Sequence, residues 1–361
     1  MAEVSNEIKK YFEGIEKEVK QAYDICNRAK AKGYEADKIV DIPLAKNMAE
    51  RVEALISIVA PQIKNSGVVE RIAELEKKYG KGDWRVAFKI AEEVANENFC
   101  KFDDKKQALE VGMRIGFGYI TNGIVSSPLE GFTSLKLKSR LDNKGQYFAL
   151  QFSGPIRSAG TTAICVFVAL TDYLRVKNGF MEYDPTKEEI KRMSIELSDF
   201  HERITNLQYF PSDEETELMT ELLPVQIDGD PSEDLEVSNY KDLPRIETNR
   251  LRSGVCLTMG EGLCQKAAKF YGKFSKWMND FGMNHWTFLD KFVKTQKNIK
   301  AREKKTKEDN ALIKPDYTFI KDIVAGRPVI TYPLRAGGLR LRYGRARNTG
   351  LSGTAIHPAT M

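Results

Sequence analysis

The stretch TSLKLKSRLDNKGQYFALQF, residues 133–152, marks the point at which the hydrophobic pattern of the chain changes. Apolar and polar residues alternate on both sides of residues 142–145, which is the period of a strand with one buried face. The four central residues, Asp-Asn-Lys-Gly, favour a turn, and Gly145 can adopt a positive φ. The pattern therefore predicts a β-hairpin.

The chain before this hairpin is patterned for helices. Apolar side chains recur there at intervals of three or four residues. Capping residues and prolines set the expected ends, and we predict helices at 5–30, 43–61, 66–79, 83–98 and 104–122. We interpret residues 1–122 as a helical N-terminal domain. It is either a docking surface or a simple packed bundle.

The hairpin runs directly into SGPIRSAGTT, residues 153–162, and then into an apolar segment, 163–176, that is typical of a buried helix. The glycines permit close backbone approach, and Arg157 supplies a fixed charge. Thr161 or Thr162 can cap a helix whose N–H groups attract phosphate. The stretch lacks the Gly-Lys-Ser/Thr of a P-loop and does not match G-x-G-x-x-G, so phosphate binding and a plain tight turn both stay open.

Two capping boxes follow, Thr186 with Glu189 and Ser212 with Glu215, and each predicts the start of a helix. Beyond an acidic, turn-rich stretch, we expect a helical hairpin at about 258–280 and 284–306. Residues 304–310 are interpreted as a linker.

The net charge is only +5, from 56 basic and 51 acidic residues, but its distribution is uneven. Eleven acidic residues lie between 212 and 242, against one lysine. Between 291 and 307 eight basic residues stand against one glutamate. This asymmetry indicates that the C-terminal third meets a polyanion, or that 291–307 is a solvated basic helix.

The stretch RAGGLRLRYGRARNTG, residues 335–350, adds five arginines and no acid. As a strand it would bury Leu339, Leu341 and Tyr343 on one face. The other face would present arginines, which a bulge at Gly344 would extend. The candidate phosphate-binding residues are therefore Arg340, Arg342, Arg345, Arg347, Arg335 and, from the earlier loop, Arg157. The competing interpretation is a set of structural arginines that bridge loop carbonyls or the acidic stretch 213–242.

Other chemistries find little support in the sequence. Five cysteines without a C-x-x-C spacing and three widely separated histidines indicate neither a disulfide framework nor a metal site. The segment Asp228-Gly-Asp230 comes closest to a metal-binding pair, but it lies among turns and prolines. The chain shows neither a membrane-spanning stretch nor a signal peptide, so we expect a cytoplasmic, nucleoid-associated protein.

Five long motifs in order resemble the large subunit of archaeal D-family DNA polymerase. They are SSPLEGF (126–132), SGPIRSAGTTA (153–163), LQYFPSDEE (207–215), PVQIDGDPSEDLEVSNYKDLPRIETNRLRSG (224–254) and AGRPVITYPLRAGGLRLRYGRARNTGLSGTAIHPATM (325–361). The resemblance implies an α+β multidomain chain. Its parts would be the helical N-terminal domain (1–122), a KH-like α/β region (123–256), a helical hairpin with a basic linker (257–310) and the start of a double-psi β-barrel (311–361).

The resemblance also implies DNA-templated nucleotidyl transfer with Mg²⁺, in a heterodimer with a small 3′–5′ exonuclease subunit that proofreads. The family's metal-binding aspartates lie beyond the position of Met361, so we expect no catalytic residue in this chain and no polymerase activity from it alone. Its expected roles are binding of the DNA primer-template and subunit assembly. We expect that the chain is a piece of a longer one, or that a second polypeptide carries the rest of the large subunit.

One departure from the family pattern concerns the loop at 153–162. The usual Gly-Gly-Thr after GPIRSA is Gly160-Thr161-Thr162 here, which weakens the case that the loop backbone touches phosphate.

Two other classes of function stay open. One is a stand-alone nucleic-acid-binding or assembly module without catalysis. The other is an independent phosphate-ester enzyme that uses the loop at 154–162.

Overall fold

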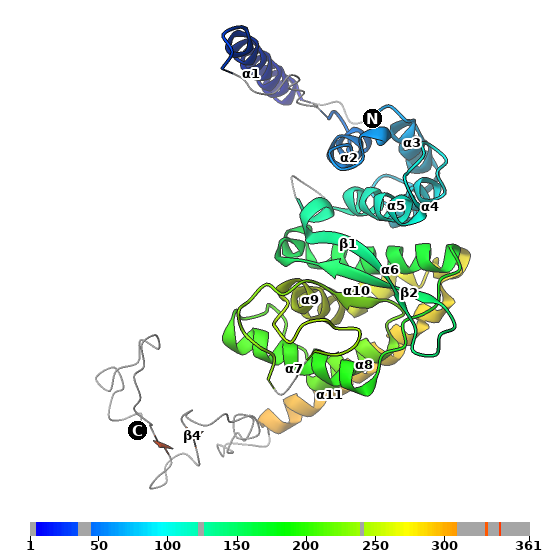
Figure 1. Ribbon diagram of the computed structural model, residues 1–361, viewed down its shortest axis with the longest axis vertical. Coiled ribbons are helices and arrows are strands. Elements are labelled where there is room, and N and C mark those ends of the chain that lie inside the picture. Colours follow the sequence, from blue (N-terminus) through cyan, green and yellow to red (C-terminus); the bar gives the residue numbers. More distant parts are fainter. Residues whose placement is uncertain are drawn as a thin grey trace.

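A computed structural model of the chain describes residues 5–34, 45–121, 126–238 and 242–308, together with the short segments 329–330 and 339–340. The described part is mostly helical and contains a small mixed sheet, so the expected α+β class is confirmed (Figure 1). No helix in these residues is both long and apolar enough to cross a membrane.

The N-terminal part is helical, as expected. Helix α1 (Asn6–Ala31) buries none of its residues. It is followed by α2 (Met48–Ile56), a 3₁₀ turn η1 (Pro61–Ile63), α3 (Val68–Tyr79), α4 (Trp84–Ala95) and α5 (Lys105–Ile120). The helix predicted from 43 to 61 is confirmed but is shorter, from Met48 to Ile56. It starts there because the Asn47 side chain accepts a hydrogen bond from the Glu50 N–H.

Helices α4 and α5 pack unusually closely. A Cβ atom added to Gly112 would lie 2.6 Å from the carbonyl oxygen of Ala91, so the α5 backbone touches α4 directly. The predicted cap of α5 is confirmed, since Asp104 accepts from the Gln107 N–H at 2.7 Å. Helix α6 packs against both of these helices.

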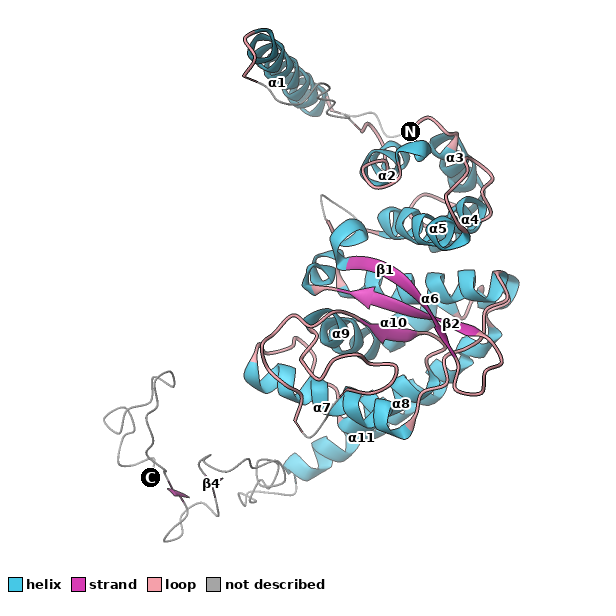
Figure 2. Cartoon of the chain, viewed as in Figure 1, coloured by secondary structure: helices cyan, strands magenta, loops and turns pink. Residues whose placement is uncertain are grey.

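The predicted hairpin is confirmed as β1 (Phe132–Ser139) and β2 (Gln146–Phe152), which run antiparallel. Its turn is longer than predicted, with Asn143 at a φ of 55° and Gly145 at 147°. Strand β3 (Gln226–Asp228) then pairs parallel with β2, which gives the order β1-β2-β3 (Figure 2).

The two faces of this sheet differ in chemistry. One face is apolar and buried, through Leu135, Phe148, Leu150 and Ile227. The other carries Lys138, Gln151, Asp228 and their polar neighbours, as the alternation of strand side chains requires. Helices therefore pack on the apolar face, and charged segments of the chain pack on the polar face.

The predicted buried helix is α6 (Thr161–Lys177), which follows β2 through the 3₁₀ turn η3 (Gly154–Ala159). Twelve of its residues, from Ile164 to Arg175, are buried. It contacts both α4 and α5 on one side and β2 on the other, so one continuous apolar core joins the N-terminal helices to the sheet.

Helices α7 (Lys187–Arg203) and α8 (Asp213–Leu222) start at Thr186 and Ser212, and both predicted capping boxes are confirmed. In each box the hydroxyl accepts from the N–H three residues on, and the glutamate carboxylate reaches back to the capping N–H.

The helical hairpin predicted at 258–280 and 284–306 is more broken than expected. Helix α9 (Ser253–Leu257) continues as a π-helical segment η4 (Thr258–Cys264) and then as α10 (Gln265–Phe274). Two 3₁₀ turns, η5 (Met278–Phe281) and η6 (Asn284–Thr287), lead to α11 (Phe288–Glu308). The predicted linker at 304–310 was wrong as far as residue 308, because α11 continues through it.

Candidate nucleic-acid interface

The loop that carries Arg157 is held by the motif SSPLEGF. The backbone N–H of Ser153 donates to the carbonyl of Gly131 at 3.0 Å, and a Cβ on Gly131 would lie 2.7 Å from the Cα atom of Ile156. Ser127 also donates to the Pro155 carbonyl at 3.1 Å. Glycine is required at 131 because the backbone of η3 occupies the space that a side chain would need.

The long acidic motif at 224–254 touches the same place. A Cβ on Gly229 or on Gly254 would fall well inside van der Waals contact with the carbonyl oxygen of Phe152. The N–H of Ser253 donates to the Ser232 hydroxyl at 2.7 Å, which joins two parts of this motif that lie 21 residues apart. Three motifs that are distant in sequence thus meet at residues 152–156.

Arg157 itself pairs with a buried carboxylate. Its Nη2 atom lies 2.8 Å from Oε1 of Glu261, a residue of η4 that is 1% exposed, while the Arg157 side chain is 39% exposed. The same oxygen accepts from the N–H of Gln208, in the motif LQYFPSDEE, at 2.8 Å. Glu261 therefore anchors a fourth motif to the loop and holds one nitrogen of the guanidinium, while the Arg157 side chain stays partly exposed.

The start of α6 differs from the prediction. Neither Thr161 nor Thr162 caps the helix; Gly160, at a φ of 82°, occupies the cap position without a side-chain hydrogen bond. The predicted threonine cap was wrong because a left-handed glycine already turns the chain into the helix. No atom lies within 4 Å of a Cβ built on Gly160, so the backbone here is accessible. Phosphate binding by this loop stays a prediction.

Most other arginines near the sheet are structural. Arg252 is fully buried, donates to both carboxylate oxygens of Glu196 at 3.0 and 2.7 Å, and contacts Asp228 at 2.7 Å. Asp228 also accepts from Lys138 at 2.7 Å and from Gln151 at 3.0 Å. Burial by itself would raise the pKa of Asp228, but Arg252 and Lys138 outweigh it and hold that pKa below its ordinary value.

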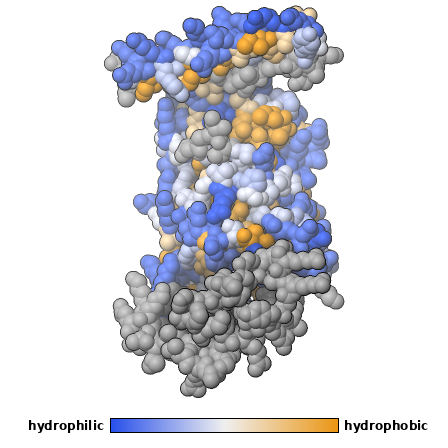
Figure 3. All heavy atoms as spheres, turned by 90° about the vertical axis from the view of Figure 1, so that its left-hand side faces the viewer, coloured by the Kyte–Doolittle hydropathy of each residue, from blue (hydrophilic) through white to orange (hydrophobic). Residues whose placement is uncertain are grey.

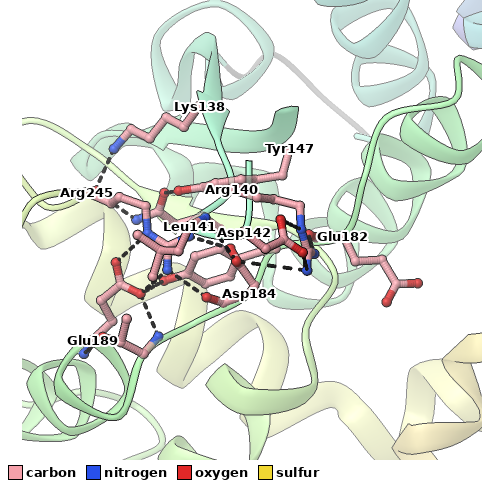
Figure 4. Close-up of polar contacts among 12 residues, drawn as sticks. Lys138, Arg140, Leu141, Asp142, Tyr147, Glu182, Asp184, Glu189 and Arg245 are labelled. Carbon is pink, nitrogen blue, oxygen red and sulfur yellow. Dashed lines mark hydrogen bonds and ion pairs between the residues drawn. The ribbon is translucent and has the colours of Figure 1, made fainter. Parts of the chain in front are cut away.

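A second ionic cluster lies at the other end of the same sheet face (Figure 4). Arg245 forms ion pairs with Asp184 and with Glu189, the latter at 2.6 Å, and its guanidinium lies over the ring of Tyr147 at 5.4 Å. No local sequence pattern indicated either cluster, because the pairs join residues that lie far apart in the chain.

These contacts bear on the magnesium that the family resemblance implies. Both oxygens of Asp228 are already occupied by cationic or amide donors, so the donor set does not fit a divalent cation. Within the described ranges, no group of three or more histidine, cysteine, aspartate or glutamate residues could hold a metal ion. We therefore derive no catalytic step for these residues.

The arginines predicted near the C-terminus fall largely outside the described residues; this applies to Arg335, Arg342, Arg345 and Arg347. For Arg340 only the backbone is described: strand β5 (Leu339–Arg340) pairs antiparallel with β4 (Val329–Ile330), Arg340 opposite Val329. The strand predicted at this point is confirmed for these two residues. That the arginines lie together on one face of this strand remains a prediction.

The described residues form an α+β fold in which several separate motifs converge on the accessible loop that carries Arg157. Comparison with known proteins identifies the family. The model of "DNA polymerase II large subunit DP2, N-terminal" matches residues 10–295, and that of the "central domain" of the same subunit matches residues 303–361. The chain belongs to the DNA polymerase II large subunit family.

Individual relatives agree with this assignment. The chain is 44% identical to the DNA polymerase II large subunit of Nanoarchaeum equitans over 375 residues, which cover 97% of the chain and 30% of that protein. The corresponding subunits of Methanothermobacter thermautotrophicus and Archaeoglobus fulgidus are each 39% identical, over 97% and 98% of the chain. The chain thus spans about 30% of the length of these relatives.

Proposed function

We propose that this chain forms the N-terminal part of the polymerising subunit of an archaeal replicative DNA polymerase, acting in complex with a small 3′–5′ exonuclease subunit. The observation that carries the proposal is the pair of family matches, which together cover residues 10–295 and 303–361. The chain's own roles are binding of the primer-template and subunit assembly. The catalytic aspartates and their Mg²⁺ belong to the rest of the complete subunit.

The proposed DNA contacts are Arg340, Arg342, Arg345, Arg347, Arg335 and Arg157. Arg157 supports this role through its geometry: Glu261 holds one nitrogen of the guanidinium, the side chain is 39% exposed, and Gly160, three residues on, is accessible. A guanidinium fixed in this way donates to a phosphate without first losing side-chain entropy. We propose as well that residues 123–256 form the KH-like region and that residues 311–361 form the start of the double-psi barrel.

The exposed helix α1 supports the assembly role. It buries no residue, yet its apolar side chains Ile8, Tyr11, Phe12 and Ile25 are between 48% and 67% exposed (Figure 3). An amphipathic helix with its apolar side in water is typical of a segment that docks on a partner. We assign this partner to the small subunit.

Duplex binding measured over a range of salt concentrations tests the proposal. Replacing Arg342 and Arg345 by alanine should flatten the dependence of log K on log salt by about 0.9 per lost phosphate contact. An unchanged slope would remove these arginines from the interface. Extension of a primer by the complete two-subunit polymerase, and its loss when residues 1–361 are deleted, tests the assignment to a polymerase as a whole.

A further inference from the structure

The hairpin of α10 and α11 carries an excess of positive charge that the predicted DNA contacts do not include. Residues 265–302 hold nine lysines and arginines and two aspartates. The inner side of the hairpin is apolar and fully buried, through Phe270, Phe274 and Phe292. The charged side chains therefore project from the outer sides of the two helices.

Part of this charge is used within the protein. Lys273 lies over the ring of Trp84 at 4.1 Å, Lys300 lies over the ring of Tyr209 at 5.2 Å, and Lys294 pairs with Asp290 at 2.6 Å. Five other lysines form neither an ion pair nor a side-chain hydrogen bond with any residue that the structure describes. They are Lys266, Lys269, Lys276, Lys291 and Lys297.

The spacing of these lysines follows the helices. Residues 266, 269, 273 and 276 are three or four apart, which places them along one side of α10 and the turn after it. Residues 291, 294 and 297 progress along α11 in the same manner. Because the two helices are about 15 and 31 Å long at 1.5 Å per residue, the lysines form extended rows rather than one compact cluster.

The composition of this surface favours nucleic acid over protein as the partner. No large hydrophobic side chain between residues 258 and 302 is exposed in the described structure. Protein interfaces depend on buried aromatic or aliphatic anchors, which are missing here. Binding to a phosphate backbone requires only positive charge, and lysine, a flexible point charge, suits contacts that ignore base sequence.

We propose that the outer sides of α10 and α11 form a second, sequence-independent contact surface for the phosphates of double-stranded DNA, and that Lys266, Lys269, Lys276, Lys291 and Lys297 are its contact residues. The inference rests on the proposed function, which supplies the DNA. It extends that function to residues other than Arg157 and the arginines at 335–347.

The test uses the 361-residue chain and a 30-base-pair duplex in fluorescence anisotropy at several salt concentrations. The five lysines are changed together to glutamine, and the control carries Lys9→Gln, Lys10→Gln, Lys17→Gln, Lys20→Gln and Lys32→Gln on the exposed helix α1. Both variants lose five positive charges; Lys266 is half-buried, and the other nine lysines are exposed. We expect the slope of log K against log salt to fall by about 2 to 4 in the hairpin variant, at roughly 0.9 per phosphate contact, and to change little in the control.

Equal slopes for the hairpin variant and the control would overturn the inference. Binding of a poly-glutamate peptide is measured as well. If the lysine variant loses peptide binding but keeps duplex binding, the partner of this surface is an acidic protein and the inference fails. The R342A/R345A variant is measured alongside: if it flattens the slope and the lysine variant does not, this inference fails and the proposed function stands. If the unaltered chain does not bind the duplex, the proposed DNA-binding role itself fails.

Discussion

At the scale of single residues, the stability of the sheet's polar face depends on buried charge. Arg252 has no exposed surface and neutralises two carboxylates, Glu196 from α7 and Asp228 from β3. It therefore links three segments that are adjacent only in the folded state. Removing Arg252 would leave Glu196 with Arg192, 3.4 Å away, and Asp228 with Lys138, so each buried carboxylate would keep only part of its compensation. Such a loss costs more than the loss of an exposed pair.

Replacing Arg252 by alanine should lower the free energy of unfolding by about 3 kcal/mol, the lower end of the cost of breaking a buried pair, because Lys138 and Arg192 still pair with the two carboxylates. The matched control is Arg250→Ala, two residues earlier, since Arg250 pairs with Asp234 at the surface, with side chains 52% and 94% exposed. That change should cost at most about 0.5 kcal/mol. Urea unfolding followed by circular dichroism measures both, and equal losses would contradict this role of Arg252.

The same network predicts a dependence on pH. The pKa of Asp228 is lower in the folded chain than its ordinary value of 3.8, so its carboxylate stabilises the fold above that value. This contribution is lost as the pH falls below 3.8 toward the folded-state pKa. We expect Asp228→Asn to be less stable at neutral pH and to lose less stability on acidification than the unaltered chain. Thermal midpoints between pH 7 and pH 2.5 provide the measurement, and parallel curves would argue against it.

At the scale of elements, local signals predicted local structure. The capping boxes at Thr186 and Ser212 and the hairpin at 133–152 depend on neighbouring residues, and the structure confirms them. The start of α6 was mispredicted because two threonines offered a cap that Gly160 made unnecessary. Trp277 and Trp286, on either side of the break between η5 and η6, are buried in the core, and such long-range packing cannot be read from a short window of sequence.

Glycine substitutions test how the elements meet. Gly254→Ala would place a methyl group against the Phe152 carbonyl, where β2 passes into the Arg157 loop, and should destabilise the fold by about 1–3 kcal/mol. Gly272→Ala, on an exposed side of α10 with no atom within 4 Å, should stabilise it by about 0.5 kcal/mol through helix propensity. Opposite signs in urea unfolding are the expected result, and a neutral Gly254→Ala would show that β2 can move.

At the scale of the whole molecule, the candidate site was only half predictable. The sequence supplied Arg157 and the glycines around it, since a charged residue between small ones is visible in a short stretch. Its partner Glu261 lies 104 residues further on, in a segment whose pattern is that of an ordinary buried helix. Which acid meets which arginine depends on the packing of α6 against η4, and so on the complete fold.

The exposure of α1 leads to a prediction for the molecule as a whole. Because none of its residues is buried, deletion of residues 1–34 should leave the free energy of unfolding of the remainder unchanged within about 0.5 kcal/mol. Burial of a comparable apolar side in a core would contribute several kcal/mol, at about 25 cal/mol per Å². The measurement is urea unfolding of the truncated and complete chains, monitored by tryptophan fluorescence, since Trp84, Trp277 and Trp286 all lie outside α1. A large loss of stability would mean that α1 packs on the rest of the chain in solution, and its apolar side would then be a core contact rather than the proposed docking surface.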